Sequence, residues 1–160
     1  MKNLEIAKLA KLAATAALYV ALCYAFAFVS YGPVQFRIAE MLIVLPYYDK
    51  KYTASLIVGT FVANIFMYGI FDMIFGTLAT ALVCLVVVLT KTKKIIAPAA
   101  AIVNGLVIGA MLRYIFAEPG AFWAIGLSVA VGEFAVVLAG VLTFAGIEKT
   151  NKKFIEFLKR

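Results

Sequence analysis

Long apolar stretches separated by short lysine clusters dominate this sequence and leave few folds open to it. Of the 160 residues, 66% are apolar and 14% are charged, against roughly 45–50% and 25% in soluble domains. Surface-to-volume scaling leaves about a third of the surface of such a chain exposed, so water cannot be the solvent for this much apolar surface. The composition excludes a soluble enzyme, a coiled coil and a disordered tail, and indicates a protein embedded in lipid.

The apolar stretches have the length of membrane spans. A helix needs about 20 apolar residues to cross a bilayer, so six helices account for most of the chain. We therefore predict an all-α membrane protein with six transmembrane helices in a single integral-membrane domain over residues 1–160. The helices are expected at about residues 12–29, 33–46, 53–68, 72–89, 95–116 and 122–145, with a basic tail at 148–160 that suits an anionic leaflet.

The first two segments need separate arguments. The first apolar run also resembles a signal peptide, but it lacks the polar stretch that usually precedes cleavage, so we expect a retained helix. The second segment, 33–46, is short and polar, and its apolar run ends at Pro46. Such segments occur in membranes only where protein or a cavity satisfies their polar groups. We therefore expect residues 33–46 to form a short helix that lines a site.

The basic residues predict the orientation. With six spans, all but Arg37 and Arg113 of the 15 lysines and arginines fall at one side of the topology, in the termini and alternate loops. The positive-inside rule assigns that side, with both termini, to the cytoplasm. The net charge of +7 then reflects topology rather than nucleic-acid binding, for which no recognition motif is present.

Polar residues within the apolar segments gather in the outer half of this topology. Ionisable groups inside lipid face a cavity or one another by default. Several also have structural interpretations: Asp72 as a helix cap, Arg37 with Glu40 as an ion pair three residues apart, and the two asparagines as contacts between helices. Glu133, near the middle of the sixth helix, is the hardest to explain this way. The candidate site residues are Gln35, Arg37, Glu40, Asn64, Asp72, Asn104, Arg113 and Glu133.

Aromatic and small residues form two further patterns. The aromatic residues at the outer end are typical of an interfacial belt, although a few of them could also sandwich a flat heterocycle: Tyr31, Phe36, Phe66, Tyr68, Phe71, Tyr114, Phe116, Phe122 and Trp123. Small residues that recur every four positions let helices approach closely, within this chain or against a partner: Ala13, Ala17, Ala21 and Ala25, and Gly105 with Gly109.

Catalytic machinery is missing from the sequence. It has no histidine, and no glycine is followed by lysine, so a phosphate-binding loop of the G-x-x-x-x-G-K-[ST] type is absent. Cys23 and Cys84 lie in apolar stretches without metal-site spacing and are expected to be core or lipid-facing residues. We therefore predict that the chain is not an enzyme and hydrolyses no ATP itself.

Four stretches together resemble the membrane-embedded substrate-binding (S) components of energy-coupling factor (ECF) transporters, and among them the QueT-type family for queuosine precursors. They are GPVQFRIAE at residues 32–40, Leu45-Pro46, residues 64–72 and FGTLAT at 75–80. The resemblance implies a six-helix bundle in the bacterial cell membrane, a membrane scaffold partner and two partner ATPases that hydrolyse ATP. It also implies docking through small residues at the cytoplasmic end of the first helix, where Ala13 and Ala17 match.

The candidate site suits this substrate class chemically. A 7-deazaguanine such as preQ1, preQ0 or queuine offers N1–H and a 2-amino group to one carboxylate, for which Glu133 or Glu40 is the candidate. Asn64, Asn104 or Gln35 would donate to the carbonyl, and Asp72 would meet an aminomethyl-type nitrogen. Two alternatives remain open: an S component for another vitamin or heterocycle, and a stand-alone proton-coupled carrier in which Glu133 and Asp72 relay protons.

Overall fold

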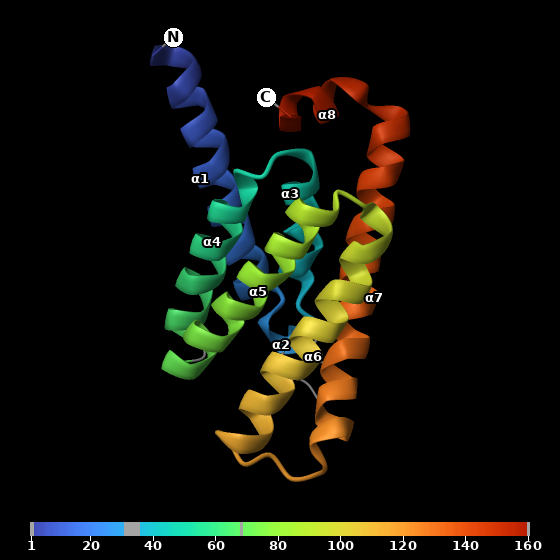
Figure 1. The fold of residues 1–160 in the computed structure, drawn as a ribbon. Coiled ribbons are helices and arrows are strands. Elements are labelled where there is room, and N and C mark those ends of the chain that lie inside the picture. The colour runs from blue at the N-terminus through green and yellow to red at the C-terminus, as the bar shows by residue number, and fades with distance from the viewer. Residues whose placement is uncertain (1, 31–35, 68, 160) are drawn as a thin grey trace.

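The computed structural model describes residues 2–30, 36–67 and 69–159, and within these ranges each regular element is a helix (Figure 1). The long helices run along the length of the bundle, with α5 and α6 inclined to α4 and α7, and α1 begins at the same end of the bundle at which α8 ends. The elements are α1 (Lys2–Ala25), α2 (Ala27–Ser30), η1 (Ile38–Val44), α3 (Leu45–Tyr48), α4 (Tyr52–Met67), α5 (Ile70–Thr90), η2 (Lys93–Ile95), α6 (Ile96–Tyr114), α7 (Phe122–Thr150) and α8 (Lys152–Lys159).

Four helices among the described residues are long and apolar enough to cross a membrane, namely Glu5–Ala25, Ile70–Thr90, Lys93–Tyr114 and Phe122–Thr150. Two shorter apolar helices occupy the remaining predicted positions, Ile38–Tyr48 and Tyr52–Phe66. The 16 residues of α4 reach about 24 Å at 1.5 Å per residue, which is less than the hydrocarbon thickness of about 30 Å. The all-helical membrane class is confirmed, with four full-length candidate spans and two short helices.

The second segment is short and irregular, as predicted, but it does not end at Pro46. It forms the 3₁₀ helix η1, and α3 follows directly and ends at Tyr48. Pro46 lies in the first turn of α3, where a proline is tolerated because the N–H it lacks has no partner within a helix. The segment therefore turns from 3₁₀ to α geometry at the proline and stays buried within the bundle.

Both ends of the chain are more helical than predicted. α1 already begins at Lys2, ten residues before the apolar run, and α7 extends to Thr150. The tail forms α8, which crosses the end of the bundle from α7 toward α1 (Figure 1). Ile155 and Leu158 of α8 are buried in the core, and the Lys11 side chain donates to the carbonyls of Phe157 and Leu158 at 3.2 Å each. The tail therefore packs onto the protein, and its contact with an anionic leaflet stays a prediction.

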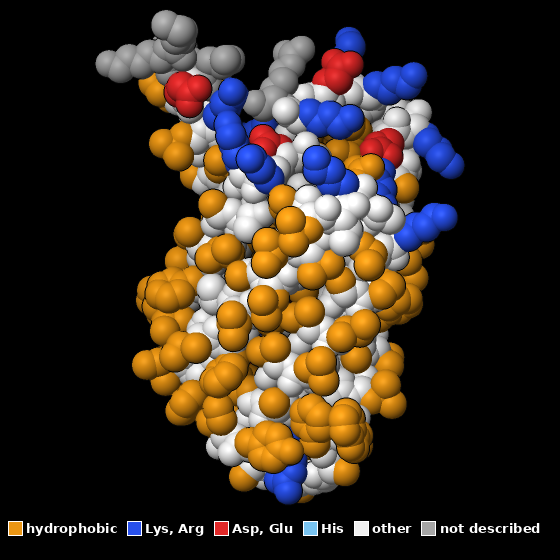
Figure 2. Space-filling model, in the orientation of Figure 1, with side chains coloured by type: hydrophobic (Ala, Val, Ile, Leu, Met, Phe, Trp, Pro, Cys, Tyr) orange, Lys and Arg blue, Asp and Glu red, His pale blue; other side chains and the backbone are white. Residues whose placement is uncertain are grey.

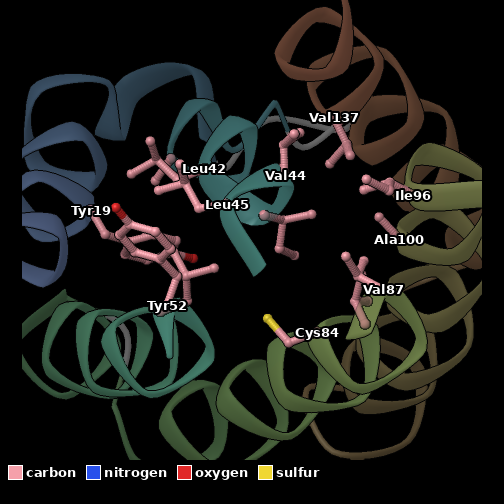
Figure 3. Close-up of a cluster of buried hydrophobic side chains, with 14 of the residues drawn as sticks. Tyr19, Leu42, Val44, Leu45, Tyr52, Cys84, Val87, Ile96, Ala100 and Val137 are labelled. Carbon is pink, nitrogen blue, oxygen red and sulfur yellow. The ribbon is translucent and has the colours of Figure 1, made fainter. Parts of the chain in front are cut away.

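The main core surrounds η1 and α3. Side chains from α1, α4, α5, α6 and α7 point toward this segment (Figure 3). Ile43 and Val44 are fully buried at its centre, as is Leu56 on α4. Cys23 and Cys84 are free and buried, so of the two predicted positions, core or lipid-facing, they occupy the core. A short segment encircled in this way is held in place by its neighbours, so its polar residues acquire fixed positions.

Small residues pack α6 closely against α7. A Cβ on Gly105 would lie 2.9 Å from the Gly126 carbonyl oxygen, and one on Gly109 would lie 2.7 Å from the Gly126 Cα. These two glycines therefore serve a contact within the chain. The alanine ridge of α1 differs, because Ala13 and Ala17 are exposed, as are the two alanines that follow at the same spacing.

The surface divides into two zones (Figure 2). Apolar side chains cover most of the length of the bundle, whereas lysines and acidic residues gather at the end where α1 begins. Large apolar residues are highly exposed in the apolar zone, as at Leu127 on α7 and Leu89 on α5, with 66% and 71% of their surface accessible. This pattern is expected of a protein whose sides face lipid.

Candidate functional site

Arg37 and Glu40 are carried by the buried 3₁₀ segment. Arg37 is the N-cap of η1 and Glu40 lies in its first turn, where its N–H donates to the Arg37 carbonyl at 2.9 Å. Their side chains are 2% and 1% exposed, and they lie close enough to interact electrostatically. A 3₁₀ helix of seven residues is longer than usual. The unusually long 3₁₀ helix therefore begins at the two buried charged residues of this segment.

Tyr19 on α1 holds Glu40. The Tyr19 hydroxyl donates to Glu40 Oε1 at 2.5 Å, the distance found when a hydroxyl binds a carboxylate. Thr80 on α5 lies within hydrogen-bonding reach of the same carboxyl group, and the Thr80 and Thr60 hydroxyls are 3.3 Å apart. Glu40 Oε2 is buried without a hydrogen-bond partner in the described part of the chain. One oxygen of Glu40 is therefore fixed and the other is available.

Glu133 brings a second carboxyl group from α7. It is 2% exposed, and its Oε2 is buried without a hydrogen-bond partner among the described residues. It interacts electrostatically with Glu40 and Arg37. A close backbone contact sets this arrangement, because a Cβ on Gly140 would lie only 2.6 Å from the Met41 carbonyl oxygen. The glycine lets α7 approach η1 so closely that Glu133 and Glu40 share one environment.

Asn64 and Asp72 join the cluster from α4 and α5. The Asn64 amide donates to the Asp72 backbone carbonyl at 2.9 Å, and the half-buried Asp72 carboxylate lies within electrostatic reach of Arg37. A Cβ on Gly76 would meet Asn64 Nδ2 at 2.5 Å and Arg37 Nη1 at 3.6 Å. The absence of a side chain at Gly76 thus makes room for the amide beside the guanidinium.

The capping interpretation of Asp72 is wrong. Helix α5 has Gly69 as its N-cap, with a φ of 86° and no side-chain cap hydrogen bond, and Asp72 lies within the first turn instead. A glycine is favoured at such a positive φ because it has no Cβ. The Asp72 side chain is therefore not needed to begin the helix.

Two predicted residues, Asn104 and Arg113, are not joined to this cluster by any described contact. Asn104 is buried, but its amide donates to the Ala100 carbonyl of its own helix at 3.1 Å. Arg113 is partly exposed in the last turn of α6, and no described contact links it to Glu40 or Glu133. Gln35 lies outside the described residues. The structure therefore assembles Arg37, Glu40, Asn64, Asp72 and Glu133 from the predicted set.

Sequence reasoning missed Tyr19, Thr60, Thr80 and Gly76. A signal existed for Tyr19, since a tyrosine hydroxyl in the middle of an apolar helix must find a partner when buried. The two threonines carry a weaker signal, because a threonine hydroxyl can instead bond to its own helix. Gly76 was not recognisable as a spacer without knowledge of what faces it.

The outer aromatic residues lie mostly on the surface. Phe71 and Phe116 form an edge-to-face pair with ring centroids 6.1 Å apart, and Tyr114 stacks on Phe122 at 6.1 Å. Trp123 is 75% exposed. Exposed rings at the ends of α5, α6 and α7 favour the belt interpretation. Tyr31 and Tyr68 lie outside the described residues.

The fold and this cluster define a class of protein: a multi-pass membrane protein whose helices enclose two carboxyl groups, an arginine and an amide far from bulk water. The comparisons with known proteins identify it further. A family model described as QueT transporter matches residues 9–149. The chain therefore belongs to the QueT transporter family, a family of transporters rather than enzymes, as the sequence resemblance predicted.

A curated relative supports this assignment. The chain is 35% identical over 82 residues to a protein named Queuosine precursor transporter QueT from Lactococcus lactis subsp. cremoris (strain MG1363). The match covers 50% of this chain and 48% of the relative, so the chain spans about half the length of the curated relative it matches. No solved structure matches the chain.

Proposed function

We propose that this protein captures a queuosine precursor, a 7-deazaguanine such as preQ1, preQ0 or queuine, as the membrane-embedded S component of an ECF-type transporter. The observation that carries the proposal is the pair of buried carboxyl groups, Glu40 and Glu133, each with one oxygen lacking a hydrogen-bond partner in the described chain. Buried acceptors without partners are costly. A ligand rich in N–H donors would satisfy them.

The contacts suggest a role for each group. Glu133 is the better candidate for the N1–H and 2-amino edge, because Tyr19 and Thr80 already engage Glu40. Asn64 and Arg37 are the candidate donors in the cluster to a ligand carbonyl. Asp72 lies where α4 meets α5, at the end of the bundle away from α8 (Figure 1), and would meet an aminomethyl nitrogen.

The central test compares matched acid variants in purified full-length protein. Glu40→Gln and Glu133→Gln preserve size but replace one acceptor oxygen with a donor. Each is expected to weaken binding of preQ1 by about tenfold or more, since hydrogen bonds to charged groups contribute about 1.5–3 kcal/mol. Glu118→Gln, in an exposed loop, is the control and should bind normally.

Two measurements complete this test. Thermal unfolding without ligand shows whether each variant folds, and queuine, preQ0 and guanine are titrated beside preQ1 to define the ligand class. Unchanged affinity in both buried-acid variants would refute the site. Stabilisation by another vitamin, and by none of the 7-deazaguanines, would assign a different ligand to the same site.

The exposed alanine ridge of α1 is the proposed docking surface for the scaffold subunit. Ala13 and Ala17 are exposed, whereas Gly105 and Gly109 pack against α7 within the chain. Ala17→Leu is expected to reduce co-purification with the scaffold and its two ATPases while ligand binding persists. Ala139→Leu, at another exposed alanine on α7, is the control. Equal co-purification of both variants would contradict this docking surface.

The electrostatic contact between Glu40 and Glu133 also favours a second candidate, a stand-alone proton-coupled carrier, because neighbouring buried acids can relay protons. Uptake of preQ1 into proteoliposomes distinguishes the two. Uptake by the isolated chain under a proton gradient supports the carrier, whereas uptake that requires the ATPases and ATP supports the S component.

A further inference from the structure

A cavity at the lysine-rich end of the bundle is separate from the proposed substrate site. Its volume is about 650 Å³. It lies between α1, the connection from α3 to α4, the end of α5 and α8. Its charged lining residues are Lys8, Asp49, Lys50, Lys51, Lys91 and Lys159. The fold therefore brings lysines from four separate parts of the chain to one concave site.

The positive charge of this cavity exceeds the negative charge of its own lining residues. Five lysines and one aspartate give a net charge of +4, and none of these lysines forms a salt bridge in the described ranges. Asp49 is engaged, because its carboxylate accepts from the Lys51 N–H at 3.0 Å. Lysines elsewhere at this end serve the fold: Lys93 pairs with Glu148, and Lys11 binds the end of α8. Of the cavity lysines, Lys159 lies within electrostatic reach of Glu148, and none of the five forms a salt bridge or anchors α8 in the described part of the chain.

Part of the wall of the cavity is apolar. This part is formed by residues of α3 and the last turns of α5, where Tyr47 and Val88 are partly exposed and Pro46 and Val87 are buried. A small inorganic anion would contact only the lysines and would leave the apolar part of the wall exposed to water. A phospholipid has both a phosphate and acyl chains, so it matches a cationic rim above an apolar wall. The lysine-rich end also adjoins the apolar zone (Figure 2), where lipid phosphates lie in a bilayer.

The backbone conformation of Lys91 is a second, independent indication that the lysine side chains of this cavity serve to bind an anion. Lys91 is the C-cap of α5 with φ 50° and ψ 34°, a left-handed conformation that glycine adopts more easily than other residues. The sequence nevertheless has a lysine here, at a position where the backbone conformation favours glycine. Because that side chain lines the cavity, Lys91→Gly removes a cavity charge while suiting the backbone.

We propose that this cavity binds the headgroup of an anionic phospholipid, such as phosphatidylglycerol, from the adjacent leaflet. Basic pockets between membrane helices are known to hold anionic headgroups. The lysines contact the phosphate, and the apolar wall contacts the first carbons of the acyl chains. The bound lipid joins α1, α5 and α8 at this end, and its binding does not depend on the identity of the transported substrate.

The experiment titrates lipid into the full chain in a neutral detergent and follows both thermal unfolding and lipid retention by native mass spectrometry. Phosphatidylglycerol is compared with phosphatidylcholine of the same chains and with inorganic phosphate. The cavity variant is Lys50→Gln, Lys51→Gln and Lys91→Gly combined. The control removes three exposed lysines outside the cavity: Lys94→Gln, Lys152→Gln and Lys153→Gln.

Phosphatidylglycerol is expected to bind the parent protein and the control with similar affinity. The cavity variant should bind it roughly a hundredfold more weakly, since each lysine near a lipid surface contributes about fivefold. Equal affinity in the cavity and control variants would overturn the proposal, as would equal binding of phosphatidylcholine. Full competition by inorganic phosphate would assign the cavity to a free anion instead. If the triple variant does not fold, Lys91→Gly alone must still lose about fivefold.

Discussion

The contact between Gly140 and Met41 gives the sharpest test of how the site is built. In Gly140→Ala the new Cβ would lie 2.6 Å from the Met41 carbonyl oxygen and 2.8 Å from its Cα. Ordinary contacts begin near 3.4 Å, so α7 and η1 must separate by about 0.8 Å, the difference between 3.4 and 2.6 Å. The obstacle is backbone, which cannot rotate away as a flexible side chain could.

The expected change in stability combines two opposing effects. Overpacking of this kind costs about 1–3 kcal/mol, whereas alanine favours a helix over glycine by about 1 kcal/mol. Gly146→Ala isolates the second effect, because Gly146 lies on the same helix and a Cβ there meets nothing within 4 Å. We therefore expect Gly146→Ala to stabilise the protein and Gly140→Ala to be about 1–3 kcal/mol less stable than that control.

Unfolding of both variants in the same mixed micelles measures this difference, and ligand titration provides a second measurement. Met41 adjoins Glu40 in η1, so a displaced η1 should also weaken ligand binding in Gly140→Ala but not in Gly146→Ala. Equal stabilisation by both substitutions would refute the reasoning, because it would mean that α7 and η1 do not meet backbone to backbone.

Three further predictions follow from individual contacts. Tyr19→Phe removes the hydroxyl that donates to Glu40 and should weaken ligand binding by about tenfold in a titration. Tyr24→Phe changes an exposed tyrosine on the same helix and should leave the affinity unchanged, so equal affinity in the two variants would contradict the role of the Tyr19 contact. Lys11→Met removes two hydrogen bonds to the last carbonyls of α8 and should speed proteolysis of α8 relative to Lys94→Met; equal rates would show that the lysine does not anchor α8. Trp123→Ala should leave ligand affinity unchanged, since the ring is 75% exposed; a loss would place it in the binding site.

The helical class was predictable because it follows from apolar run length alone. Helices of about the length that a bilayer requires were recognisable over α5, α6 and α7, and the breaks between them carry lysines or Pro119-Gly120. The ends of α1 and α7 were not, because charged residues that extend a helix beyond lipid interrupt the apolar pattern. The continuation past Pro46 was missed because a proline can either end a helix or lie in the first turn of one.

The candidate site was predictable in part for a related reason. Burial cost identifies polar residues that need partners inside lipid, and this argument found Arg37, Glu40 and Glu133, which the fold brings together. The cost of burial gives no information on which residues face one another. Asn104 satisfies its amide on its own helix, so its presence in an apolar segment did not indicate membership of the cluster.

The charge balance of the cluster bears on which of the proposed precursors would bind most tightly. Arg37 lies within electrostatic reach of three carboxyl groups, on Glu40, Asp72 and Glu133, so the cluster holds more acidic than basic groups. A buried carboxylate without a counter-charge is costly, so a guest that brings a positive charge would favour the ionised form of these groups and gain more from this site than a neutral guest. On this argument a precursor with an aminomethyl-type nitrogen should bind more tightly than preQ0 or guanine. The same carboxyl groups that make the empty site costly would then account for the selectivity of the filled one.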